Sequence, residues 1–202
     1  MRWQLYLLSD TGVARSEAKV KRQVLFVQGG GEGVHDQWDD KLVASLEREL
    51  GPRYEIRYPR MPNEGDPQYA SWNVALQKEL GKLRGEAILI GHSIGGTILI
   101  NALAEHPTRR APGGVFLISA PFIGKGGWSS EDMGPMSDLG TRLPAQVPVY
   151  MYYGSKDDTV PSEHAGLYER AMPAAVIRRL ASRDHQLNND LSEVAADVRR
   201  LG

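Results

Sequence analysis

One strand–turn–helix pattern constrains the fold of this 202-residue chain more than any other feature. Residues 87–90 form an apolar run of the length of a buried strand, and residues 94–104 are apolar almost throughout, as expected of a central helix packed on a sheet. The turn between them has the form Gly91-x-Ser93-x-Gly95. Because a side chain at either glycine would collide with the neighbouring strand or helix, this pattern is typical of a tight turn that presents its serine.

This spacing of glycines is that of a nucleophile elbow, in which the serine stands clear of the sheet, often with strained dihedral angles. The helix that follows offers unpaired N–H groups and the positive end of its dipole to a developing oxyanion. The alternative is an ordinary strand-to-helix turn that contains a serine. The rest of the chain distinguishes the two, because a nucleophilic serine needs a base and an acid.

The composition excludes several classes of function. The chain carries 24 lysines and arginines against 25 aspartates and glutamates, a net charge of −1, so nothing draws it to nucleic acid or to an anionic membrane. The absence of cysteine excludes thiol nucleophiles, thiolate metal sites and disulfides. No apolar run approaches the roughly 18 residues of a membrane span, and the first residues carry no clear signal-peptide cleavage site. We therefore expect a cytoplasmic protein.

The length predicts one domain, residues 1–202, with a possible edge strand and N-terminal extension in residues 1–22. From residue 23 onward, predicted strands and helices alternate. The predicted strands are 23–28, 54–58, 85–90, 114–121, 147–153 and 175–180, and the predicted helices are 37–50, 68–83, 94–104, 162–172 and 191–201. This order predicts an α/β fold with a mainly parallel sheet and helices on both faces. Residues 122–143 are expected to form a long, partly helical excursion over one face.

Two polar residues follow later strands in the order that serine chemistry requires. A serine hydroxyl is a poor nucleophile until a base, usually a histidine oriented by a carboxylate, takes its proton. Asp157 comes after the strand predicted at 147–153, and His185 comes after the last predicted strand. Ligands of such sheets bind beyond the carboxyl ends of the strands, so we expect Ser93, Asp157 and His185 to meet there. The adjacent Asp158 is the second candidate for the acid, since only one of the two carboxylates can meet the histidine.

Together these features resemble the α/β-hydrolase superfamily over residues 23–201. An acid-loop pattern of that superfamily, Gly-x-x-Asp-x-x-Val-Pro, is matched by Gly154, Asp157, Val160 and Pro161. The short chain, and Met61-Pro62 followed by Trp72, narrow the resemblance to the small, lid-poor serine hydrolases that include the retinoblastoma-binding serine hydrolase. The resemblance implies a fold of α/β-hydrolase type with a minimal cap domain or none. It also implies catalytic roles for the serine, the aspartate and the histidine named above.

The glycine-rich loop after the first predicted strand is expected to supply one of the two donors of an oxyanion hole. One donor is expected to be the N–H of Ile94, the residue after the serine, and the second the N–H of Gly30, with Gly31 as the alternative. The superfamily often has His-Gly at the start of this loop, where this chain has Gln28-Gly29. A phosphate-binding fingerprint does not fit the loop, because other residues fall where glycine is required.

Aromatic side chains near these loops are candidate walls of a substrate pocket. The candidates are His35, Trp38 and Trp128, together with residues 121–136. A core position is the alternative for Trp38. Of the remaining histidines, His92 is expected to pack as scaffold within the turn, and His164 is expected to be solvated at the start of a helix.

The sequence thus predicts an esterase-like serine hydrolase that cleaves a small carboxylic ester, thioester or amide through an acyl-enzyme. It predicts no metal and no cofactor, and its expected partner is the small-molecule substrate. Two alternatives remain. The chain could be a binding or scaffold protein that keeps the fold with little turnover, or an acyltransferase with the same three residues.

Overall fold

The structure is a computed structural model that describes residues 20–106, 108, 110–134 and 136–202. The edge strand predicted within residues 1–22 lies outside the described residues, apart from residues 20–22. In the part that is described, no helix is both long and apolar enough to cross a membrane.

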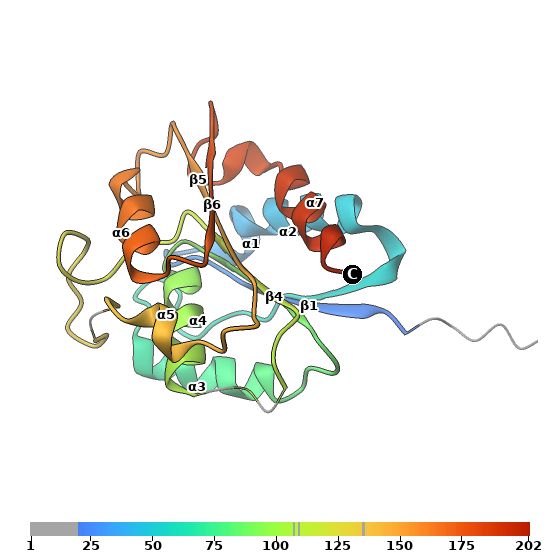
Figure 1. The fold of residues 1–202 in the computed structure, drawn as a ribbon. Helices are drawn as coiled ribbons and strands as arrows, with labels where there is room; N and C mark the ends of the chain where they lie inside the picture. The colour runs from blue at the N-terminus through green and yellow to red at the C-terminus, as the bar shows by residue number, and fades with distance from the viewer. Residues whose placement is uncertain (1–19, 107, 109, 135) are drawn as a thin grey trace, which may run out of the picture.

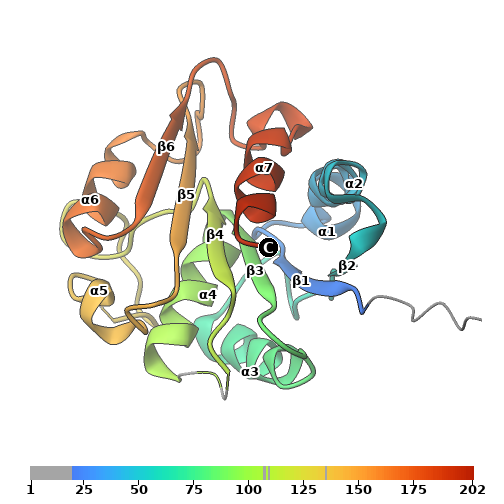
Figure 2. The same ribbon diagram turned by 45° about the vertical axis from the view of Figure 1, so that its right-hand side comes forward.

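Six parallel strands form one sheet (Figure 1). Their order, β2-β1-β3-β4-β5-β6, runs from right to left in Figure 2. The strands are β1 Arg22–Val27, β2 Tyr54–Arg57, β3 Ile88–His92, β4 Gly114–Ile118, β5 Val149–Gly154 and β6 Val176–Leu180. Each lies within about two residues of a predicted strand, apart from the ends of β3 and β4. The predicted α/β fold with a parallel sheet is therefore confirmed.

Helices cover both faces of this sheet, as predicted. They are α1 Val34–Gln37, α2 Asp39–Leu50, α3 Tyr69–Leu80, α4 Ser93–Glu105, α5 Leu139–Arg142, α6 Glu163–Ala171 and α7 Ser192–Arg200, with short 3₁₀ turns at Gly51–Arg53 and Leu187–Asn189. Figure 2 shows α2 and α7 over one face, and α3, α4 and α6 over the other. No cap domain stands over the sheet among the described residues.

The alternation of side chains along each strand builds two cores on one sheet. In β1, Val24 and Phe26 pack toward α2 and α7, whereas Leu25 and Val27 pack toward α3 and α4. All four side chains are buried. Successive residues of a strand point to opposite faces, so a strand covered on both sides reads as a continuous apolar run. This explains why the buried strands were visible in the sequence.

The strand order reverses between β1 and β3. The chain leaves β1 outward to β2 and then crosses back to β3 on the other side of β1, with Val27 paired in register to Gly91. Consequently the glycine loop after β1 and the turn after β3 leave the same edge of the sheet side by side. Such a switch point is where open parallel sheets bind ligands.

The predicted excursion after β4 is mostly irregular. Within the described part of residues 122–143, the regular structure is α5 and a single bridge between Ile123 and Trp128. The segment is nevertheless anchored, since Phe122, Ile123 and Met136 are buried in the core under α4 and α6. The partly helical character is confirmed, but only one helical turn carries it.

The start of α4 packs against the end of β1 at backbone distance. A Cβ atom at Gly95 would lie 1.8 Å from the Gln28 carbonyl oxygen, and one at Gly91 would lie 2.5 Å from the Cα of Gly96. No side-chain rotation relieves a clash with backbone atoms. The glycines on either side of Ser93 are therefore required by the approach of α4 to the sheet.

We predict that Gly95→Ala destabilises the fold by about 3 kcal/mol or more, the upper end of typical overpacking costs. Gly166→Ala is the matched control, because it also places alanine within a helix, where the new Cβ meets only the Arg170 guanidinium at 3.7 Å. There the gain in helix propensity should stabilise the protein by about 0.5–1 kcal/mol. Urea unfolding of both variants measures the difference, and equal effects would contradict the proposed contact.

Candidate active site

The turn between β3 and α4 holds Ser93 in an unusual backbone conformation. Its φ is 51°, in the left-handed region that residues other than glycine seldom adopt. Ser93 is the first residue of α4, and it is only partly buried between the buried His92 and the helix. The strain is sustained by the packing around the turn and aims the hydroxyl away from the sheet.

The structure brings together the three residues that the sequence singled out. The Nε2 atom of His185 lies 3.1 Å from the Oγ atom of Ser93. The Nδ1 atom of His185 lies 2.9 and 3.0 Å from the two carboxylate oxygens of Asp157. The Asp157 side chain is 1% exposed and that of His185 is 11% exposed, so their contact is shielded from water. A proton can pass between the hydroxyl and the imidazole at these distances.

Asp157, rather than Asp158, meets the histidine. One oxygen of Asp157 also accepts hydrogen bonds from the N–H groups of Thr159 and Val160, which orients the carboxylate, whereas Asp158 is exposed. Burial by itself raises the pKa of Asp157, but the hydrogen bonds from His185 and from Val160 outweigh burial and lower this pKa below the usual value. Asp157 is therefore ionised and can orient the imidazole.

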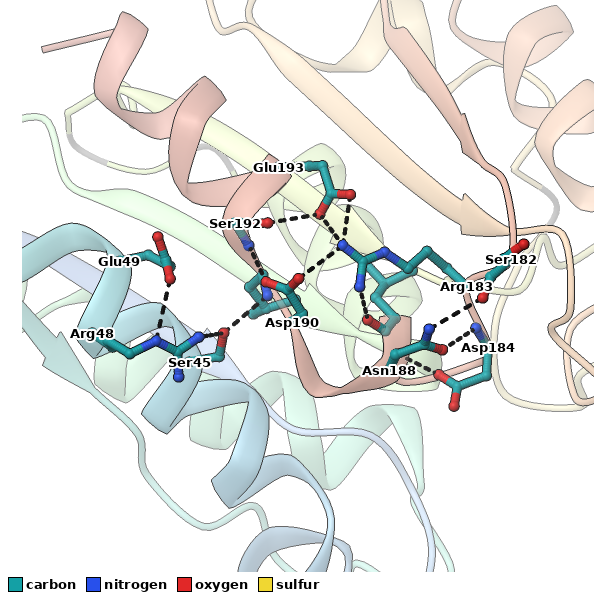
Figure 3. A network of polar contacts seen from close by, with 12 residues as sticks. Ser45, Arg48, Glu49, Ser182, Arg183, Asp184, Asn188, Asp190, Ser192 and Glu193 are labelled. Carbon is teal, nitrogen blue, oxygen red and sulfur yellow. Dashed lines mark hydrogen bonds and ion pairs between the residues drawn. The ribbon is translucent and has the colours of Figure 1, made fainter.

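The loop that carries His185 is clamped to the start of α7 by Arg183 (Figure 3). The Arg183 guanidinium donates to the Asp190 carboxylate at 2.9 Å and to both oxygens of Glu193 at 2.7 and 2.9 Å. Its other nitrogen donates to the Leu187 carbonyl at 3.1 Å. Hydrogen bonds between an ionised donor and a carboxylate are shorter and stronger than those between neutral groups.

The clamp holds a strained loop. Leu187, Asn188 and Asn189 have φ values of 50°, 58° and 55°, three consecutive residues in the left-handed region. Asn188 and Asp184 exchange main-chain to side-chain hydrogen bonds across the loop at 2.6 and 3.0 Å. Local polar bonds therefore fix the conformation in which His185 faces the serine. Spacing in the sequence gave no signal for this clamp.

In the glycine loop after β1, the N–H groups on either side of Gly30 are occupied by acceptors. Gly29 donates to the Asp39 carboxylate at 2.7 Å, and Gly31 donates to the Glu64 carbonyl at 2.6 Å. Within the described residues, the N–H groups of Gly30 and Ile94 have no hydrogen-bond acceptor. The two residues are close, because a Cβ at Gly30 would lie 2.8 Å from the Ile94 Cγ2 atom. Of the two predicted candidates, Gly30 is thus the one whose N–H is available.

Glu64 is the residue that shapes this loop, and the sequence analysis missed it. Its carboxylate accepts hydrogen bonds from the Gln28 side chain at 2.5 Å, the Gly33 N–H at 3.1 Å and the His35 N–H at 3.2 Å. Gln28 in turn accepts from the Met61 N–H at 2.9 Å. The departure from the usual His-Gly therefore has a local role: the glutamine joins the glycine loop to the loop after β2.

A hollow of about 510 Å³ opens elsewhere on the surface, near the amino ends of the strands. Its described lining includes Gln77, Leu80, Leu83, Thr108 and Arg110, but no histidine and no carboxylate. No group there can activate a nucleophile, so the hollow is not the reactive site. Among the described residues, no cluster of three histidine or acidic side chains could hold a metal ion.

The comparison with protein families agrees with this geometry. The model of the alpha/beta hydrolase family matches residues 24–201, nearly all of the chain that the structure describes. The chain belongs to the alpha/beta hydrolase family. Among curated proteins, no sequence matches this hydrolase.

Several solved structures share the fold of the hydrolase at low sequence identity. The esterase domain of a Rhodothermus marinus protein has a TM-score of 0.65 and 19% identity, over 93% of this chain and 90% of that one. Est1E from Butyrivibrio proteoclasticus, with ferulic acid bound, has a TM-score of 0.67 and 14% identity, over 92% and 90%. The CarC serine hydrolase involved in carbazole degradation has a TM-score of 0.68 and 12% identity, over 91% and 92%.

The aromatic residues predicted as pocket walls lie in different surroundings in the hydrolase. His35 stacks on Tyr58 with ring centroids 4.1 Å apart. Trp38 is half exposed, so it is not a core residue, and the Lys41 ammonium lies 5.4 Å from its ring. Trp128 packs with its ring 5.6 Å from that of His164. That these three contact a substrate remains a prediction.

The prediction that His164 is solvated was wrong. The residue is 3% exposed, and its Nδ1 atom accepts the Phe122 N–H at 2.7 Å. It therefore ties α6 to the segment after β4. Burial lowers the pKa of His164, although Glu163 and Asp157 oppose this effect. Its position at the start of a helix suggested exposure, because the sequence does not show that residues after β4 fold over that helix.

We predict that His164 makes the hydrolase less stable in mild acid. The unfolded chain takes up a proton at this residue below about pH 6.5, whereas the folded protein resists protonation, because a protonated Nδ1 cannot accept from Phe122. Stability is then complete above this pH and falls as the pH drops toward the lowered pKa, by at most about 1.4 kcal/mol per pH unit. His164→Asn, which keeps an acceptor, should lose less stability than the wild type between pH 7.5 and 5.5 in urea unfolding.

The control for this measurement is His106→Asn, which replaces an exposed histidine. We expect this variant to retain the acid-side decline of the wild type. An unchanged decline in His164→Asn would show that the buried histidine does not cause it.

Proposed function

We propose that this protein is a serine hydrolase that cleaves a small carboxylic ester, thioester or amide through an acyl-enzyme. The observation that carries the proposal is the 3.1 Å contact between the Ser93 hydroxyl and His185, whose other nitrogen faces the buried Asp157 carboxylate. A hydroxyl, an imidazole and a carboxylate in this order form the arrangement that activates a serine nucleophile. The printed names of the similar structures, an esterase domain and a serine hydrolase, support the same class of reaction.

In the first half of the reaction, the Ser93 oxygen attacks the carbonyl carbon while His185 Nε2 takes the hydroxyl proton. The Asp157 carboxylate stabilises the imidazolium that forms. The negative charge that develops on the carbonyl oxygen is received by the N–H groups of Gly30 and Ile94, each typically worth about 3 kcal/mol in the transition state. The bond to the leaving group then breaks, and the imidazolium returns its proton to that group.

In the second half, water attacks the acyl-enzyme and gives a proton to His185. Collapse of the second tetrahedral intermediate breaks the bond to Ser93, and the proton returns to the serine oxygen. The carboxylic acid leaves, and no cofactor is consumed. Apart from the substrate and water, every reacting group in these steps belongs to the chain itself.

We predict that a fluorophosphonate probe labels the wild type at Ser93 and that Ser93→Ala abolishes labelling. The same substitution should lower kcat for p-nitrophenyl acetate by roughly 10⁴-fold to 10⁶-fold, since it removes the nucleophile. Ser71→Ala, an exposed serine on α3, is the control and should behave as the wild type. Equal labelling of wild type and Ser93→Ala would refute the proposal, and a wild type that is folded but never labelled would favour a scaffold protein.

The adjacent aspartates allow a matched test of the acid. We predict that Asp157→Asn lowers kcat by roughly 10⁴-fold, because the histidine loses the partner that orients it and stabilises its charge. Asp158→Asn makes the same replacement of one carboxylate oxygen by an NH2 group at the neighbouring residue and should alter kcat less than about twofold. Steady-state kinetics on the same p-nitrophenyl ester provide both values. A loss of the same size in both variants would assign the effect to the loop and not to the carboxylate.

Added nucleophiles distinguish hydrolysis from acyl transfer. If water is the acyl acceptor, free carboxylic acid remains the main product when an alcohol or amine is added at millimolar concentration. An acyltransferase would instead form the new ester or amide preferentially. Product analysis by chromatography decides between the two.

A further inference from the structure

A buried carboxylate–imidazole pair lies directly behind the proposed reactive residues. Asp39, the first residue of α2, is fully buried, and His92, the last residue of β3, is 2% exposed. The Nδ1 atom of His92 lies 2.9 and 3.0 Å from the two Asp39 oxygens. Its Nε2 atom lies 3.2 Å from the main-chain oxygen of His185. The sequence predicted only a packing role for His92 and did not point to Asp39.

The partners of His92 determine its charge. A carboxylate and a backbone carbonyl can only accept hydrogen bonds. A neutral imidazole carries one N–H, so one of its two nitrogens would present a lone pair to an acceptor oxygen. The imidazolium alone donates at both nitrogens and satisfies both contacts.

We propose that His92 is held as a buried imidazolium. Together with Asp39 it forms a positioning pair, which holds the glycine loop after β1 and the loop that carries His185 against the turn that carries Ser93. Asp39 completes the link, because it also accepts the Gly29 N–H at 2.7 Å. The pair therefore joins Gly29, the residue before Gly30, to the main chain of His185. This role rests on the proposed function, but the charge on His92 does not.

The surroundings favour the charged form. The ionisable groups that face His92 are Asp39 from α2, His185 from the loop after β6, with ring centroids 4.9 Å apart, and Asp157 from the loop after β5. Burial lowers the pKa of His92, but the Asp39 charge, the hydrogen bonds to Asp39 and the His185 carbonyl, and the Asp157 charge outweigh burial and raise it. The N-terminus of α2 also favours a negative charge at Asp39.

The link explains how two loops far apart in the sequence keep a common geometry. The His185 carbonyl is fixed by an N–H of the turn that also carries Ser93, so the base and the nucleophile share one frame. The Gly29 N–H is fixed by the same pair, which orients the following peptide. Asp39 and His92 are buried behind the turn that carries Ser93, so they are positioning residues and should affect kcat more than KM.

Nitrogen-15 NMR of the histidine rings tests the charge directly. In the wild type at pH 7.5, we expect both His92 nitrogens to show the chemical shifts of an imidazolium. In Asp39→Asn the ring loses its charge partner and should show the shifts of a neutral tautomer at the same pH. The His92 signals are identified by their loss in His92→Gln. If His92→Gln does not fold, they are identified as the ring signals that change in Asp39→Asn. Neutral shifts in the wild type would overturn the proposal, whether or not the protein hydrolyses esters.

Kinetics test the positioning role. We expect Asp39→Asn to lower kcat by up to about 10²-fold, the effect of a small misplacement of reacting groups, with KM changed less than about threefold. Asp40→Asn, the exposed neighbour, is the matched control and should keep the wild-type kcat. Ser93→Ala identifies a failure of the proposed function separately, because it should abolish activity without changing the His92 shifts.

The pH profile separates positioning from mere stability. Because the pKa of His92 is raised on folding, its second hydrogen bond is present at lower pH and is lost as the pH rises through that pKa. The wild-type kcat should therefore decline on the alkaline side. Asp39→Asn should have a low kcat at every pH and should not show this decline. A variant that is merely less stable would retain the wild-type profile after correction for the folded fraction, and that outcome would refute the positioning role.

Discussion

The approach of α4 to the sheet at backbone distance is the constraint on which the rest of this structure depends. A Cβ at Gly95 would occupy the place of the Gln28 carbonyl, and a Cβ at Gly91 would collide with Gly96. Since α4 cannot retreat without opening the core, the turn between β3 and α4 must be tight, and Ser93 takes up a left-handed backbone conformation with φ 51°. The strain is local, whereas the packing that sustains it extends over α4 and both its neighbouring strands. The partial exposure of Ser93, and the N–H of Ile94 that has no acceptor among the described residues, are consequences of that packing.

Three carboxylates organise the loops that meet at this turn, and each comes from a different segment. Glu64 gathers N–H groups of the glycine loop, Asp39 joins that loop to His92, and Glu193 receives the Arg183 guanidinium beside His185. The loops at the carboxyl edge of the sheet bury apolar side chains such as Phe122 and Leu187, and polar contacts also fix their shape. Ionic contacts add little net stability, because water screens the exposed ones and desolvation offsets much of the attraction in the buried ones. Their effect is to select one arrangement of loops that apolar packing alone would leave open.

The fold and the three proposed reactive residues could be predicted because each leaves a local trace. Apolar runs covered on both faces marked the strands, the glycines around Ser93 marked the turn, and Asp157 and His185 each followed a strand end in the expected order. The surroundings of His164 could not be predicted, since residues far along the chain bury it. Asp39 and Glu64 left no trace either, because an acidic residue at the start of a helix or in a loop is ordinarily solvated.

The sequence by itself determined the alternation of strands and helices, and it singled out Ser93, Asp157 and His185 as the proposed serine, acid and base. These depend on periodicity and on spacing along the chain, which the sequence contains. Only the tertiary structure decided which glycine N–H is free, since Gly29 and Gly31 are occupied by partners 10 and 33 residues away. It also decided that both nitrogens of His92 face acceptors, one of them on a residue 93 positions distant. The physical reason is that a hydrogen bond depends on direction and distance in space, and those are set only when the strands have taken their places in the sheet.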